Sequence, residues 1–265
     1  GLPEFCFMLG QSVHSREAGY ARACAVTTLG NKKHRPLPRV SNCCHANLTA
    51  GIELFIKGAL KLAKRSTGRS ELIGAYNSYH GSTHGALSLL GSEHQKIGYR
   101  PLLPNTRFIR FNDEEDLELI STKTAAVIIE TIQGGAGFIL PENDYLLKVK
   151  KRCEAVGALL ILDEIQPGFG RTGRFFGFEN FNVIPDIIVM GKGMGGGLPV
   201  GAFSASHELM RNFEEKPKLG HITTFGGNPV IAAASLATLR VIRDSKLMRD
   251  IPEKEALFRA ELNHS

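Results

Sequence analysis

Three apolar stretches of the sequence each end in a side chain that can take part in chemistry. Together they offer a carboxylate, a carboxylate with an amide, and a lysine: Glu130, Asp163 with Gln166, and Lys192. The stretches, 125–129, 159–162 and 187–190, are typical of strands buried on both faces. Because open α/β sheets bind ligands at the carboxyl ends of their strands, we expect these groups to lie in one site.

The lysine at residue 192 follows directly on one of these buried stretches. A charged amine left unpaired in such a place costs several kcal/mol, so it normally has a partner, a lowered pKa or a covalent bond. The alternative is a lysine whose stem reaches from the strand end to solvent. Glycines at 191, 193 and 195–197 remove side chains around Lys192, as expected where the backbone approaches a ligand.

Asp163 and Gln166 have ordinary interpretations as a turn cap and a surface amide. One strand away from a lysine, they also suit a flat heteroaromatic cofactor bound to Lys192 as a Schiff base, with Asp163 keeping the ring nitrogen protonated. A protonated ring lets pyridoxal phosphate act as an electron sink. The released lysine amine would then carry protons.

Strands and helices alternate around these residues. Apolar periodicity predicts helices over 53–65 and 146–156, the second closed by Gly157. A nearly all-apolar run that begins after Pro229 predicts a third helix over 230–242. We expect the third helix to be buried, because it is almost entirely apolar. The order predicts a three-layer α/β domain with a mostly parallel central sheet.

The composition limits the function classes. The chain has 265 residues, 43% hydrophobic and 22% charged, and a net charge of +6, which indicates a globular protein. No apolar run reaches the ~20 residues of a membrane helix, so we expect a cytoplasmic protein that does not bind membranes. The one dense basic run, 31–35, lacks interleaved aromatic residues and indicates a solvated loop rather than a nucleic-acid surface.

Five cysteines without paired spacing indicate reduced thiols rather than a disulfide framework. The adjacent Cys43, Cys44 and His45, with His34 upstream, form the one conceivable metal-ligand group. Neighbouring cysteines seldom reach the same tetrahedral ion, so we expect no metal.

Three ordered motifs in residues 163–173, 191–202 and 224–229 resemble the class III (omega) aminotransferases. Their sequences are Asp-Glu-Ile-Gln-Pro-Gly-Phe-Gly-Arg-Thr-Gly, Gly-Lys-Gly-Met-Gly-Gly-Gly-Leu-Pro-Val-Gly-Ala and Thr-Phe-Gly-Gly-Asn-Pro. The family comprises fold type I, pyridoxal-phosphate-dependent enzymes and includes acetylornithine, ornithine and 4-aminobutyrate aminotransferases. The resemblance covers about residues 51–245.

The resemblance implies a role for each motif residue. Lys192 would carry the cofactor, Asp163 would pair with its ring nitrogen, Gln166 would reach its phenolic oxygen and Tyr79 would stack on its ring. Thr224 resembles the threonine that binds the cofactor phosphate of the neighbouring subunit, which implies a homodimer with shared active sites.

Further positions follow from the same comparison of motifs. Glu130 resembles a glutamate at a strand end that does not touch the cofactor ring itself but contacts the residues around it. His80 would belong to the cofactor site as a turn or packing residue rather than a catalytic one. Gly51 corresponds to the family's phosphate loop, although the surrounding sequence departs from it. Gly135 and Ser82 replace a glutamate and an arginine that handle substrate in some members, and the loss of the arginine argues against a strict acetylornithine enzyme.

The resulting hypothesis is transamination between an ω-amino acid or related amine and a keto acid such as 2-oxoglutarate. The alternatives are another class III reaction, such as that of the glutamate-semialdehyde aminomutase, and an incomplete, non-catalytic fragment. We expect residues 1–50 to form an atypical N-terminal segment, 51–245 the cofactor-binding domain and 246–265 the start of a C-terminal region, with the chain truncated at both ends.

Overall fold

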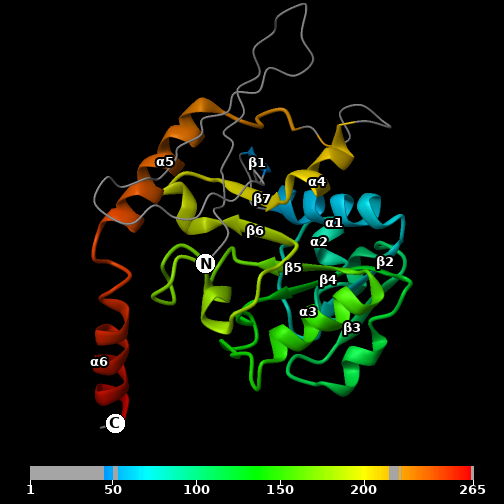
Figure 1. Ribbon diagram of the computed structural model, residues 1–265, viewed down its shortest axis with the longest axis horizontal. Helices are drawn as coiled ribbons and strands as arrows, with labels where there is room; N and C mark the ends of the chain where they lie inside the picture. The colour runs from blue at the N-terminus through cyan, green and yellow to red at the C-terminus, as the bar shows by residue number, and fades with distance from the viewer. Residues whose placement is uncertain (1–44, 50–52, 215–220, 222, 264–265) are drawn as a thin grey trace, which may run out of the picture.

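The computed structural model describes residues 45–49, 53–214, 221 and 223–263. Its strands form one seven-stranded sheet in the order β1-β7-β6-β5-β4-β2-β3 (Figure 1). The strands are β1 (His45–Thr49), β2 (Glu71–Ala75), β3 (Thr106–Ile109), β4 (Thr124–Glu130), β5 (Leu159–Asp163), β6 (Ile187–Gly191) and β7 (Gly201–Ala205). All neighbours from β3 to β6 pair parallel, whereas β7 and β1 add antiparallel strands at one edge. The predicted α/β fold with a mostly parallel sheet is confirmed.

Helices and short 3-10 turns connect and cover the strands (Figure 1). The helices are α1 (Glu53–Thr67), α2 (His84–Leu87), α3 (Tyr145–Val156), α4 (His207–Met210), α5 (Pro229–Asp244) and α6 (Ile251–Asn263). The 3-10 turns are η1 (Ile97–Tyr99), η2 (Glu115–Leu119), η3 (Gly177–Phe181), η4 (Lys192–Gly195) and η5 (Arg211–Phe213). Among the described residues, no helix is both long and apolar enough to cross a membrane.

The central strands of the sheet are buried on both faces. Helices on the two faces and the sheet between them form the three layers. Along β4 every residue is buried, and alternate side chains join two different hydrophobic clusters. Val127 and Ile129 belong to the cluster with α3 and α5, whereas Ala126 and Ile128 belong to the cluster with α1. This alternation explains why the central strands read as continuous apolar runs.

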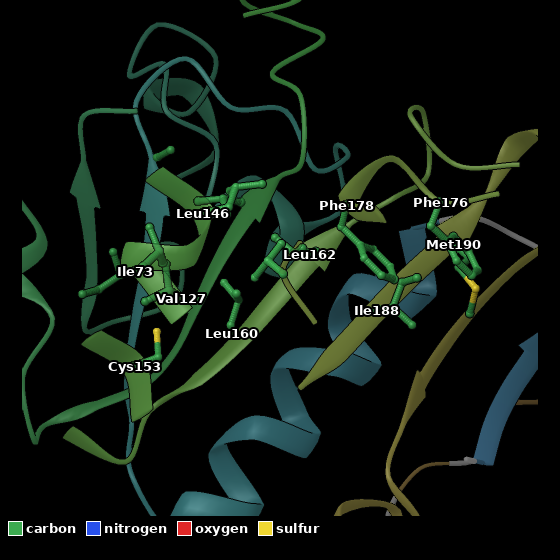
Figure 2. Packing of buried hydrophobic residues seen from close by; sticks show 14 of the residues in the cluster. Ile73, Val127, Leu146, Cys153, Leu160, Leu162, Phe176, Phe178, Ile188 and Met190 are labelled. Carbon is green, nitrogen blue, oxygen red and sulfur yellow. The ribbon is translucent and has the colours of Figure 1, made fainter. Parts of the chain in front are cut away.

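Figure 2 shows the cluster on the α3 side of the sheet. Leu146 and Cys153 of α3 belong to it together with Val127 and Leu160. Further along the chain, Phe178 lies beside Ile188 and Phe176 beside Met190. Burial in this apolar layer raises the pKa of the Cys153 thiol to about 12, so this thiol is neutral at physiological pH.

The ends of α3 and α5 follow their sequence signals. Gly157 ends α3 in the left-handed conformation with φ 71°, which glycine adopts without steric cost. Asn228 caps α5, its side chain accepting hydrogen bonds from the N–H groups of Val230 and Ile231, and Pro229 occupies the first turn.

Three expectations about secondary structure need correction. Helix α5 is not buried, because only one face packs on the domain while Val230 and Val241 are 65% and 58% exposed. The small residues after the glycine-containing turn 79–85 also predict a helix running to Leu90, whereas the structure forms only the single turn α2. Strands β1 and β7 were not predicted, since neither contains a sustained apolar run.

Candidate functional site

The carboxyl ends of β4, β5 and β6 border one cavity of about 190 Å³. Glu130 and Asp163 are the last residues of adjacent parallel strands and stand directly opposite each other in the register. The cavity is lined by Tyr79, His80, Gly81, Glu130, Asp163, Ile165, Gln166, Pro167 and Lys192. It lies where parallel α/β sheets place ligands.

Asp163 is held at the floor of this cavity by two hydrogen bonds. Its Oδ2 lies 2.8 Å from the Nδ1 of His80, and its Oδ1 accepts from the N–H of Ile165 at 3.0 Å. Both side chains are buried, and the Nε2 of His80 is buried without a hydrogen-bond partner in the described part of the chain. Each carboxylate oxygen therefore keeps a free lone pair for a donor within the cavity.

Glu130 fixes the wall opposite the loop after β5. Its carboxylate accepts from the N–H of Tyr79 and the N–H of Gly134, both at 3.0 Å. Burial raises the pKa of Glu130, whereas the nearby His80 and these two donors oppose the shift. One carboxylate thus joins two loops and places the half-exposed Tyr79 ring at the cavity.

Lys192 begins η4 immediately after β6. Its backbone adopts φ 40°, a left-handed conformation that costs a residue with a side chain free energy. Its side chain is exposed and lines the cavity, and within the described residues the amine has no ionic or hydrogen-bond partner. A free amine thus borders the cavity that contains Asp163.

Two of the glycines after Lys192, Gly195 and Gly196, allow close packing. A side chain at Gly195 would meet Val200 at 2.6 Å, and one at Gly196 would meet Thr238 of α5 at 2.2 Å. Gly196 lets η4 lie against α5, and Gly195 leaves room for Val200, so both support the turn that carries the lysine.

Gln166 is exposed and lies over a glycine of the neighbouring loop. A Cβ on Gly134 would fall 2.4 Å from the Oε1 of Gln166. The next glycine, Gly135, would place its Cβ 3.3 Å from the Cβ of Tyr79. Glycine at both positions therefore leaves space for the two side chains that frame the cavity.

The structure brings together most residues that the sequence singled out for this site. Tyr79, His80, Glu130, Asp163, Gln166 and Lys192 all line the cavity. Thr224 lies exposed in the turn before α5 and is not a lining residue. Gly51 lies outside the described residues. The individual roles of these residues remain predictions.

Comparison with known proteins places the chain in a family. The family model described as "Aminotransferase class-III" matches residues 49–265. The chain belongs to the class III aminotransferases. This class III chain is 43% identical over 212 residues to the acetylornithine aminotransferase of Methanosarcina acetivorans, an alignment that covers 78% of the chain and 52% of that protein.

Two solved structures resemble this class III aminotransferase chain closely. The ornithine aminotransferase from Toxoplasma gondii superposes with a TM-score of 0.78 at 30% identity, covering 83% of this chain and 53% of that chain. The taurine:2-oxoglutarate aminotransferase from Bifidobacterium kashiwanohense, solved in complex with PLP and glutamate, gives a TM-score of 0.76 at 28% identity, covering 83% and 55%. The chain spans about half the length of the relatives it matches.

Sequence reasoning missed one functional group of this class III site. Glu164, adjacent to Asp163, was read only as part of a motif, yet it is fully buried and accepts three hydrogen bonds. The sequence does contain a signal for this residue, since a second acid follows the buried strand directly. An acid that faces away from the cavity at a strand end needs hydrogen-bond donors of its own.

Proposed function

We propose that this class III chain binds pyridoxal phosphate and transfers an amino group between an ω-amino acid or related amine and a keto acid such as 2-oxoglutarate. The observation that carries the proposal is that the amine of Lys192, which has no partner among the described residues, lies beside the same cavity as the Asp163 carboxylate. When bound, the cofactor supplies an electron sink for a carbanion at the substrate carbon.

Asp163 and His80 would hold the cofactor ring in its protonated form. With Nδ1 protonated, His80 donates to Oδ2 of Asp163, and the N–H of Ile165 donates to Oδ1, so both carboxylate oxygens are held in place beside the cavity. The carboxylate of Asp163 would accept a hydrogen bond from the protonated ring nitrogen. The orphan Nε2 of His80 and the free lone pairs of Asp163 suit a polar group within the cavity.

Lys192 would bind the cofactor covalently and later move the substrate proton. Its side chain is exposed, so the amine reaches both the cavity and the solvent from which substrate enters. Tyr79 offers a ring face for stacking, and the Gln166 amide offers a donor to an oxygen on the ring edge. These two residues would orient the cofactor while Lys192 performs the proton transfer.

We also propose a homodimer and a cytoplasmic location. Several large apolar side chains are exposed on segments next to the cavity: Tyr79, Phe138, Ile139 and Leu140. A cluster of this kind suits a protein interface. The exposed Thr224 is available to a neighbouring subunit, as the family resemblance implies. The cytoplasmic location rests on cysteine spacing that indicates reduced thiols.

The test is to incubate the purified chain with pyridoxal phosphate, follow the absorption band of a covalent adduct, reduce with borohydride and map the modified peptide. We expect the label on Lys192 and its loss in Lys192→Ala. Lys148→Ala is the matched control, because Lys148 pairs with Glu114 on the surface, away from the cavity.

The outcome separates binding from turnover. Labelling of Lys192 together with amino transfer to 2-oxoglutarate from a panel of ω-amino acids would support the full proposal. Labelling without transfer would support the alternative of a non-catalytic fragment. A band that survives Lys192→Ala would contradict the assignment of this lysine.

A further inference from the structure

Glu164 is a buried carboxylate that the proposed chemistry does not use. It follows Asp163, so its side chain points away from the cavity, and its side chain is fully buried. Its N–H donates to the carbonyl of Val189 at 2.8 Å, which continues the pairing with β6 by one residue. Pairing with the sheet therefore holds the backbone of Glu164 in place.

The carboxylate of Glu164 accepts hydrogen bonds from two separate segments. The hydroxyl of Thr131, the first residue after β4, donates at 2.6 Å. At the start of η3, the N–H of Gly177 donates at 2.7 Å and that of Phe178 at 2.9 Å. All three contacts are donors, which is the arrangement that an ionised carboxylate requires.

These contacts close the loop of residues 165–176. The loop leaves the sheet at the backbone of Glu164 and returns to its side chain at Gly177, so one residue holds both ends. Near the start, the N–H of Gly168 donates to the Glu164 carbonyl at 3.1 Å, and Pro167 lies where a Cβ on Gly177 would meet it at 2.9 Å. The two limbs of the loop therefore meet beside this carboxylate.

The same loop supplies one wall of the cavity through Ile165, Gln166 and Pro167. Gln166 is exposed and lies two residues after Glu164. The direction of its side chain therefore depends on the short segment that Glu164 holds in place. We propose that Glu164 is a positioning residue, whose carboxylate closes this loop and so holds Gln166 over the cavity. The inference rests on the proposed binding of pyridoxal phosphate.

The charge of Glu164 fits this role. Burial raises its pKa to about 7, although the hydrogen bonds from Thr131, Gly177 and Phe178 act in the opposite direction. Asp163 is the charged group that adds to the rise. Above neutral pH the carboxylate is ionised and serves all three donors.

The decisive experiment is a double-mutant cycle between Glu164 and Gln166 in the full chain, read out as the dissociation constant for pyridoxal phosphate. Glu164→Gln keeps the shape of the side chain but replaces one carboxylate oxygen by an amide N–H₂ group, which cannot accept from the hydroxyl and N–H donors around it. We expect it to weaken binding about tenfold, the equivalent of one hydrogen bond to a charged group. In a Gln166→Ala background the same change should alter affinity by less than about twofold, because the positioned side chain is gone.

Glu179→Gln is the matched control. Glu179 accepts the N–H of Phe176 at 2.8 Å, so the same chemical change removes a carboxylate from the same region without touching the cavity. We expect native affinity from this variant. Amide hydrogen exchange of residues 165–178 without cofactor should accelerate in Glu164→Gln and, apart from the amide of Phe176 that Glu179 accepts, stay unchanged in Glu179→Gln.

Distinct results would overturn each proposal. An equal loss of affinity with and without Gln166, native affinity in Glu164→Gln, or unchanged exchange of the loop would show that Glu164 does not position Gln166. If the unmodified chain itself bound no pyridoxal phosphate, the proposed function would fail, and the positioning role would fail with it.

Discussion

The Nδ1 of His80 lies 2.8 Å from the Oδ2 of Asp163, although 83 positions separate the two residues in the sequence. Both side chains are buried, and His80 is the neighbour that fixes the direction of the carboxylate. The contact joins the turn after β2 to the end of β5. We infer that this histidine holds the acid in place rather than transferring protons.

Replacing His80 should therefore lower stability even without cofactor. His80→Phe leaves the buried Oδ2 of Asp163 without its partner, and we expect a loss of about 1–3 kcal/mol in the free energy of unfolding. Urea unfolding at pH 7.5 measures this. His84→Phe is the control: His84 is exposed on α2, and its replacement should change stability by less than about 0.5 kcal/mol. Similar losses in both variants would contradict the role of the His80 contact.

Gly134→Ala should disturb the site while leaving the fold intact. The new Cβ would fall 2.4 Å from the Oε1 of Gln166, a flexible and exposed side chain that can move away. We expect a dissociation constant for pyridoxal phosphate raised about threefold to tenfold, because one hydrogen bond to the cofactor is lost. The melting temperature should stay within about 2 °C of that of the unmodified chain.

A control for this substitution comes from Gly98 in η1, where an added Cβ meets no atom within 4 Å. Gly98→Ala should bind pyridoxal phosphate with native affinity. Native affinity in Gly134→Ala as well would show that Gln166 does not contact the cofactor.

The central strands could be predicted because their burial on both faces leaves continuous apolar runs. Strands β1 and β7 could not, since β7 is Gly-Ala-Phe-Ser-Ala and its burial depends on the pairing partners rather than on its own residues. The burial of α5 was overestimated for a related reason. An almost uniformly apolar helix carries no periodic signal, so the sequence does not indicate which face packs.

Asp163, Glu130 and Lys192 could be predicted as site residues because each of them lies at the end of an apolar run. The contact of His80 with Asp163 and the three donors to Glu164 join residues far apart in the chain. Such pairs depend on the order of strands in the sheet, which no local pattern encodes. Hydrogen-bond partners of buried acids were therefore the least predictable part of the site.

Arg69 should contribute strongly to stability although it lies far from the cavity. Its guanidinium donates to the carbonyls of Thr124, Val156 and Gly157 at 2.9–3.0 Å, which joins the end of α3 to the start of β4. Arg69→Met removes this donor and leaves the three carbonyls without it, and we expect a loss of about 1–3 kcal/mol by chemical unfolding. Arg107→Met, at a half-exposed ion pair with Glu71, should be nearly neutral.

The pH dependence of stability should reveal the buried charge of Glu164. Its pKa rises from 4.5 to about 7 on folding, so the folded state binds a proton more tightly than the unfolded state does. The contribution of Glu164 to stability is thus fully present below pH 4.5 and is lost as the pH rises through 7. The shift corresponds to at most about 3 kcal/mol.

Glu164→Gln does not titrate, so its stability relative to the unmodified chain should improve steadily between pH 5 and 8. Urea unfolding of both proteins at several pH values measures this difference, with Glu179→Gln as the reference. At pH 8 the ionised Glu164 still serves its three donors, which the amide cannot do, so the loop should exchange faster in the variant even where the variant gains in stability. A stability difference that does not change with pH would mean that Glu164 stays ionised throughout this range. The free-energy cost of burying its charge would then have to be offset by the three hydrogen bonds alone.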